Sequence, residues 1–222
     1  MRPVHGDASI APAMRGEQLE LERLAREIRR RARLGDDEVA LATTIAGRVL
    51  GPNAIAIDPC IRGAAYLITN GEGHQIVLNP AAHDIRFHVA HEIGEWALRF
   101  LAKFDGDEGA RERAANYLAA AILAPPSALL RAYAATGERI RALASAFGLS
   151  QTSIVLRLAE VRGDERAVVT RTGYVFLRSQ GAFPWATVPL LDVARGQARW
   201  AGLAKARLRG GIDEGRVALR AR

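Results

Sequence analysis

The chain has 222 residues, of which 49% are hydrophobic and 25% are charged. These values are ordinary for a globular protein and exclude a disordered or fibrous chain. The single cysteine, Cys60, has no partner for an internal disulfide, which fits a reducing compartment. Residues 1–16 contain no apolar run long enough for a signal peptide, and the most apolar stretch, residues 117–135, is interrupted by two prolines. We therefore expect a cytoplasmic protein without a membrane-spanning helix.

The net charge of +7 lies in the last quarter of the sequence. Residues 1–170 carry 21 basic and 21 acidic side chains, whereas residues 171–222 carry 10 basic and 3 acidic side chains. Such a bias can attract nucleic acid or an acidic partner. It is more often an arginine-rich solvated surface, and we favour that interpretation.

Apolar spacing and turn signals predict helices followed by short strands in the first part of the chain. Three acidic residues at 36–38 are typical of a helix start, and residues 70–73 are a strong turn signal. The predicted elements are helices over residues 17–33 and 39–49, and strands over residues 54–57, 63–69 and 75–78.

The second part of the chain is predicted to be mostly helical, with helices over residues 81–103, 111–123, 127–135, 138–147 and 151–161. The last two form a helix–turn–helix pattern. Residues 167–177 are predicted to be a strand or a strand pair, and residues 191–208 a helix.

These elements predict an α+β fold that is mostly helical, with a small antiparallel sheet beside the central helix. We expect residues 1–16 to be loosely ordered and residues 17–161 to form one domain that includes the helical segment 138–161. Residues 162–222 would form a basic region that is packed on this domain or appended to it.

The central predicted helix carries the sequence His91-Glu92-Ile93-Gly94-Glu95. His91 and Glu95 are four residues apart, so they lie on one face of a helix, with about 6 Å of rise between them, and can reach one ion. Glu92 projects beside them, where a carboxylate can serve as general base toward a water. The usual peptidase motif has a second histidine where Glu95 stands. A carboxylate can bind zinc, but its negative charge weakens the ion as a Lewis acid.

One histidine and two glutamates on a helix also fit an ordinary amphipathic surface, so the flanking segments decide the interpretation. These segments are IVLNP at 76–80, RFHVAHEIG at 86–94 and ERAANYLAAAILAP at 112–125. Together they resemble the ImmA/IrrE family of metallopeptidases. In that family a strand ending in Asn-Pro precedes an Arg-Phe-x-x-Ala-His-Glu-x-Gly-His helix and a Glu-x-x-Ala-Asn-x-Phe-Ala-x-x-Leu-Leu-x-Pro helix. The resemblance covers roughly residues 17–161.

The resemblance implies a zincin-like metallopeptidase domain in which His91 and Glu112 bind zinc and Glu92 is the general base. Glu95 takes the second ligand position and departs from the family pattern. Asn116, one turn after Glu112, is expected to hold a ligand in place or to support the fold. Manganese is the alternative to zinc, because one histidine and two glutamates shift the preference toward harder ions.

His88 is an alternative ligand, since it lies three residues before His91 and could supply the imidazole that Glu95 replaces. Against this, His88 and Glu95 are seven residues apart, which is about 10 Å along a helix axis. The two side chains could hardly bind one ion together with His91 between them.

Three functions are compatible with these features. The first is an intracellular zinc-dependent endopeptidase, for which the resemblance implies a substrate such as a helix–turn–helix repressor, cut in a stress, phage or mobile-element response. The second is a weakened or inactive metal-site protein that binds a repressor or an antitoxin-like partner. The third is a DNA-binding regulator that uses the basic region and the segment 138–161. We favour it least, because the candidate recognition helix offers only four side chains to a groove: Gln151, Thr152, Ser153 and Arg157.

Overall fold

The computed structural model describes residues 16–71, 73–102, 104, 107–136 and 139–162, and five further strands, 166–169, 174–177, 186–189, 212–213 and 216–220. Two compact units are present, one formed by residues 19–157 and the other by residues 1–18 and 158–222. The predicted loose segment 1–16 lies outside the described residues apart from Gly16, and the predicted helix 191–208 lies wholly outside them.

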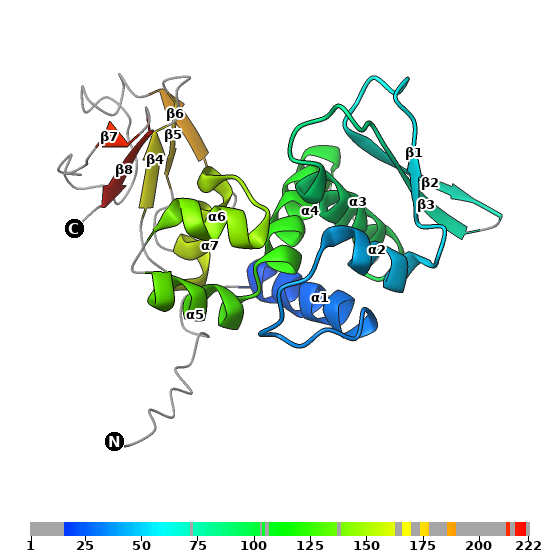
Figure 1. Ribbon diagram of the computed structural model, residues 1–222, viewed down its shortest axis with the longest axis horizontal. Helices are drawn as coiled ribbons and strands as arrows, with labels where there is room; N and C mark the ends of the chain where they lie inside the picture. The colour runs from blue at the N-terminus through cyan, green and yellow to red at the C-terminus, as the bar shows by residue number, and fades with distance from the viewer. Residues whose placement is uncertain are drawn as a thin grey trace, which may run out of the picture. The chain divides into compact units, whose positions relative to one another are not determined.

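The described residues confirm a mostly helical α+β fold (Figure 1). The helices are α1 Glu17–Arg31, α2 Ala42–Leu50, α3 Ile85–Phe100, α4 Glu108–Leu123, α5 Pro126–Thr136, α6 Ile140–Phe147 and α7 Gln151–Arg162. None of these helices alone is long and apolar enough to cross a membrane, although the bent pairs α4 with α5 and α6 with α7 reach that length and composition when each pair is taken together.

A three-stranded sheet of β1 Ile55–Ile57, β2 Ala65–Asn70 and β3 Gly73–Leu78 has the order β1-β3-β2. Strands β2 and β3 form the predicted hairpin and pair antiparallel, with Leu67 opposite Ile76. Strand β1 pairs parallel to β3, so the sheet is mixed and the prediction of a purely antiparallel sheet is wrong for β1. The chain passes from β1 to the far edge before it returns through the hairpin, and this path places β3 in the middle with the direction of β1.

The acidic residues 36–38 do not open a helix, and α2 begins at Ala42, later than predicted. They lie in a loop whose backbone accepts hydrogen bonds from one buried arginine and one surface arginine. The guanidinium of Arg29 donates to the carbonyl oxygens of Gly35 and Glu38, each at 2.5 Å. Arg131 donates to the Asp37 carbonyl oxygen at 2.9 Å and pairs with its carboxylate at 3.2 Å. Tertiary hydrogen bonds therefore override a local helix-start signal.

Helix α4 begins at Glu108, earlier than the predicted start at residue 111. Asp107 is its N-cap, and the Asp107 carboxylate accepts a hydrogen bond from the Ala110 backbone N–H at 2.6 Å. Asp107 and Glu108 thus lie at the start of the helix, where negative charge is favourable. Helix α3 begins at Ile85, after Asp84 in a left-handed conformation with φ 56°.

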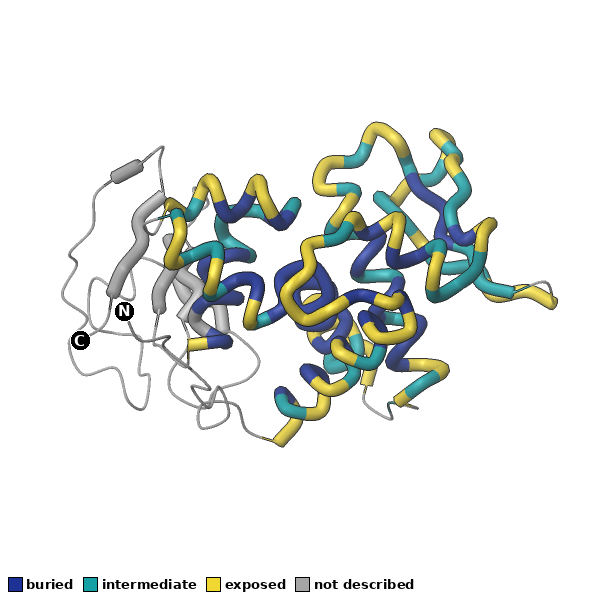
Figure 2. Tube along the Cα trace, turned by 60° about the horizontal axis from the view of Figure 1, so that its bottom comes forward, coloured by how far each residue is buried: buried dark blue, intermediate teal, exposed yellow. Residues whose placement is uncertain are grey.

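Helices α3 and α4 pack side by side, and α3 lies between the sheet and α4 (Figure 1). Most of the second half of α4 is alanine or aliphatic and is buried, as the dark segments of Figure 2 show for the central helices. Gly94 lies at the crossing, where an added Cβ would be 3.1 Å from the Ala115 carbonyl oxygen and 3.2 Å from Leu118 Cβ. A side chain at position 94 would therefore push the two helices apart.

A buried polar cluster joins α1, α4 and the first half of α7. Arg157 is 0% exposed, pairs with Glu22 and donates to the Ala124 carbonyl oxygen at 3.1 Å. The Tyr117 hydroxyl donates to Glu22 at 2.7 Å, and the guanidinium of Arg157 lies 5.4 Å from the Tyr117 ring centre. Arg157 is therefore a core residue, which removes it from the side chains that a DNA-reading helix would offer.

The second sheet has the order β6-β5-β4-β8-β7, and every neighbouring pair in it is antiparallel. Its strands are β4 Arg166–Val169, β5 Tyr174–Leu177, β6 Ala186–Pro189, β7 Ile212–Asp213 and β8 Arg216–Arg220. Strands β4 and β5 account for the strand pair predicted over residues 167–177.

We predict that Gly94→Val lowers the free energy of unfolding by about 1–3 kcal/mol, because its side chain would overpack the α3–α4 crossing. The same change at Gly47, a glycine of α2 with no atom within 4 Å of an added Cβ, provides the control. Gly47→Val should change stability by only a few tenths of a kcal/mol, since valine is a slightly better helix former than glycine. Urea unfolding of both variants measures this, and equal effects would contradict the close crossing.

We predict that the stability of the 19–157 unit depends on pH through Glu22. Burial raises the pKa of Glu22, but the charge of Arg157 and the hydrogen bonds from Arg157 and Tyr117 outweigh burial and hold this pKa below its usual 4.5. A carboxyl group whose pKa is lower in the folded state stabilises the protein at pH values above its unfolded-state pKa. This stabilisation is lost as the pH falls through the folded-state pKa. Urea titrations from pH 7 to below pH 4.5 should show this loss.

Variants at Glu22 and Arg157 separate this pair from the other carboxylates. Glu22→Gln alone should cost about 3–5 kcal/mol, because it removes the carboxylate that pairs with the buried charge of Arg157. The double variant Glu22→Gln/Arg157→Met should cost less and should show a weaker pH dependence. Equal costs for the single and double variants would show that the ion pair is not the source of the effect.

Candidate metal centre

His91, Glu92 and Glu95 lie on the face of α3 that is not buried in the core. Val89, Ala90, Ile93, Gly94, Trp96, Ala97 and Leu98 fill the core, while the three polar residues are partly exposed. The helical repeat places His91 and Glu95 one turn apart on this face. This arrangement follows from the sequence, because the apolar residues of α3 recur with the 3.6-residue period of a helix and so share its buried side.

Helix α4 brings Glu112 to the same place. One donor atom each from His91, Glu95 and Glu112 lies within 4.8 Å of the others. His91 Nε2 is 3.5 Å from Glu112 Oε2, and the Glu112 side chain is 58% exposed. Two donors of one tetrahedral ion lie about 3.3–3.6 Å apart when each bond is about 2.0–2.2 Å, so this pair has a spacing that fits a shared ion.

Asn116, one turn along α4 from Glu112, contacts two members of the group. Its Oδ1 lies 3.2 Å from His91 Nδ1, and its Nδ2 donates to Glu112 Oε1 at 3.4 Å. When His91 Nδ1 carries the proton, Nε2 keeps its lone pair and faces Glu112 Oε2. One amide side chain therefore orients both the imidazole and the carboxylate toward a common point.

Glu92 lies beside the group but is not a member of it. Burial raises the pKa of Glu92, and the nearby carboxylates of Glu95 and Glu112 raise it further, while His91 and a backbone hydrogen bond from Leu67 oppose the rise. The position of Glu92, beside the group but outside it, suits a proton acceptor better than a ligand.

The described residues place His88 outside the group of possible ligands. Its ring lies 6.1 Å from the Phe87 ring, and burial, followed by the charge of His91, lowers the pKa of His88. A lowered pKa favours the neutral imidazole. The group thus forms from His91, Glu95 and Glu112 without a contribution from His88.

Two features of the site escaped the sequence analysis. The first is Leu67 in β2, whose backbone reaches Glu92. The sequence predicts a hairpin that ends shortly before the helix carrying His91, but it does not indicate which residue of the hairpin reaches Glu92. The second is the packing role of Gly94, which places Glu112 opposite His91. A glycine inside a helical motif was its signal, because glycine there lowers helix stability unless close packing requires it.

Comparison with known proteins agrees with this geometry. Residues 61–159 match the model of a peptidase family described as the IrrE N-terminal-like domain. The match includes every residue of the site named above and confirms the family resemblance for this part of the chain. No curated protein matches the chain in sequence.

Among solved structures, a Mycobacterium tuberculosis transcriptional regulator aligns with a TM-score of 0.55 at 20% sequence identity. The alignment covers 74% of this chain and 56% of that protein, so the chain spans little more than half of its length. At this identity the likeness shows a shared fold and no more.

We predict that Asn116→Ala weakens divalent metal binding by about 10–100-fold, because His91 and Glu112 lose the amide that orients them. Competition titration against a fluorescent chelator measures the affinity. Thermal unfolding of the metal-free variant is the control, and its melting temperature should stay close to that of the parent since Asn116 is exposed. Unchanged metal affinity would show that Asn116 does not hold the ligands.

Proposed function

We propose that this chain, whose residues 61–159 match the IrrE N-terminal-like peptidase family, is a metal-dependent endopeptidase. The observation that carries the proposal is the convergence of His91, Glu95 and Glu112 from two helices, with Glu92 beside them. Three ligands with further positions left open are the arrangement of catalytic rather than structural metal sites. Zinc is the ion that the family resemblance implies.

The chemistry follows from the roles of the side chains. His91, Glu95 and Glu112 would hold the ion, and Asn116 would keep His91 and Glu112 in place. A bound divalent ion would polarise the substrate carbonyl and acidify a water. Glu92 would accept the proton from the attacking water and then deliver it to the leaving amine, so that one carboxyl group serves as base and then as acid.

The edge of the three-stranded sheet is an observation that favours a protein substrate bound in an extended conformation. Strand β2 is terminal in the order β1-β3-β2, and its Leu67 backbone already reaches Glu92. A peptide in extended conformation can add to such an edge by main-chain hydrogen bonds, without a fixed sequence. The substrate would therefore be a protein with an accessible unfolded segment. The resemblance implies a helix–turn–helix repressor of a stress, phage or mobile-element response.

A second candidate is a binding protein with little or no peptidase activity, and Glu95 is the observation that favours it. A second carboxylate in place of histidine adds negative charge next to Glu92 and Glu112. It would reduce the acidifying effect of the ion on a water. Such a protein would act by holding a repressor or an antitoxin-like partner.

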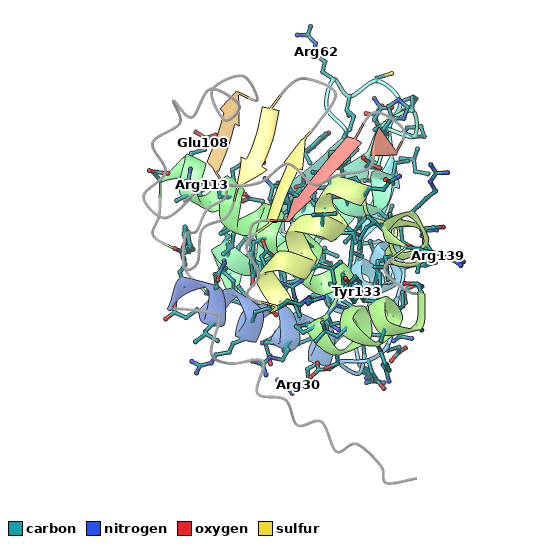
Figure 3. All side chains as sticks on the ribbon, turned by 90° about the vertical axis from the view of Figure 1, so that its left-hand side faces the viewer. Arg30, Arg62, Glu108, Arg113, Tyr133 and Arg139 are labelled. Carbon is teal, nitrogen blue, oxygen red and sulfur yellow. The ribbon has the colours of Figure 1, made fainter. Side chains whose placement is uncertain are left out.

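We predict that Glu92→Gln lowers peptide cleavage by about 10²–10⁴-fold while metal binding is retained, because the amide cannot accept the proton. The matched control is Glu108→Gln, at an exposed position in the first turn of α4 that Figure 3 labels. Cells expressing each protein, compared by mass spectrometry of new N-termini, reveal the cleaved proteins. Equal products from Glu92→Gln and from the parent would remove Glu92 as the base, and no products from the parent would favour the binding candidate.

A further inference from the structure

The donor set of the metal centre differs from that of an ordinary zinc peptidase in a way that bears on the metal itself. This step rests on the metal site in the proposed function but does not require peptidase activity. Of the three side chains that converge, one offers an imidazole nitrogen and two offer carboxylate oxygens. Cys60, the only cysteine of the chain, is exposed and is not in the group, so no thiolate is available to the ion.

Charge also separates this centre from one with two histidines. Glu95 and Glu112 bring two negative charges to the ion. Two carboxylate ligands already balance a divalent ion. Nitrogen and sulfur donors favour zinc, whereas carboxylates and waters favour harder ions such as manganese.

The exposure of the site to solvent suits a harder ion, which needs water ligands in addition to the protein donors. Manganese prefers six ligands, so three protein donors leave three positions for water. The Glu112 side chain is 58% exposed while that of His91 is 12% exposed, so the group is open to solvent on the α4 side. Waters can therefore complete a six-coordinate shell without rebuilding the protein.

Other hard ions fit the group less well. Calcium takes six to eight oxygen ligands, whereas this group supplies two carboxylates and a nitrogen. Magnesium dehydrates reluctantly and is usually held by carboxylates together with phosphates of a substrate, without imidazole. Manganese accepts both oxygen donors and one imidazole.

We infer that Glu95 shifts the preference of this centre from zinc toward manganese. Zinc binds nitrogen and oxygen donors more tightly than manganese in general, so the effect lies in the ratio of the two affinities. Glutamate at position 95 narrows that ratio relative to histidine, which allows manganese to occupy the site where it is the more available ion.

The test is a competition titration of the metal-free full chain with Zn²⁺ and with Mn²⁺, for the parent and for Glu95→His. We expect Glu95→His to raise the ratio of zinc to manganese affinity by at least tenfold. The control is Glu20→His, which adds the same side chain at an exposed position of α1 outside the group and should leave the ratio unchanged. Electron paramagnetic resonance of Mn²⁺ bound to the parent provides a second readout that does not depend on activity.

A ratio for Glu95→His within twofold of the parent would overturn the inference, as would a parent that binds zinc but gives no bound-Mn²⁺ signal. If Glu95→His does not fold, Glu95→Ala serves in its place, and its manganese affinity should fall more than its zinc affinity. The proposed function fails separately. Manganese binding with the expected ratio but no cleaved proteins would sustain this inference and remove the peptidase. Cleavage with zinc and an unchanged ratio would do the reverse.

Discussion

The close crossing of α3 and α4 is the constraint on which the rest of the site depends. His91 and Glu95 belong to one helix and Glu112 to the other, so the group exists only while the two helices stay at the spacing that Gly94 allows. The alanines of α4 serve the same end, because small side chains let two helix backbones approach. A larger residue at the crossing would move Glu112 relative to His91, and metal ligands tolerate little displacement.

Helix α4 is fixed at both ends by charge. Asp107 caps its first turn, and two buried arginines reach the carbonyl oxygens at its other end, Arg29 at Ile122 and Arg157 at Ala124. Negative groups at the start of a helix and positive groups at its end complement the helix dipole. These contacts fix the position of α4 along its axis, while the crossing with α3 fixes the distance between the two helices. Glu112, one turn after the start, is thereby held on a rigid element although its own side chain is exposed.

The sequence predicted the elements that depend on local pattern and missed those that depend on contacts. The motif helix, the α4 helix and the hairpin carry strong periodic or turn signals, and each was found within a few residues. The late start of α2 was missed because Arg29 and Arg131 hold residues 35–38 as a loop, and Arg131 lies 94 residues from Asp37 in sequence. The parallel pairing of β1 was missed because strand order depends on the path between strands. At the site, His91, Glu92 and Glu95 follow from spacing on one helix, but the approach of Leu67 depends on how β2 packs against α3.

Glu95 is the residue at which this site departs from the motif of the family that residues 61–159 match. Around Glu95, Glu112 Oε2 faces His91 Nε2 at 3.5 Å, Asn116 contacts both residues, and Glu92 is partly buried beside them. Three carboxylates this close repel one another, and the arrangement costs stability unless a cation offsets their charge. Such a geometry would suit the positive ion of the proposed function. Since two of its three donors are carboxylates, the more consistent interpretation of Glu95 is a change of preferred ion rather than the loss of one.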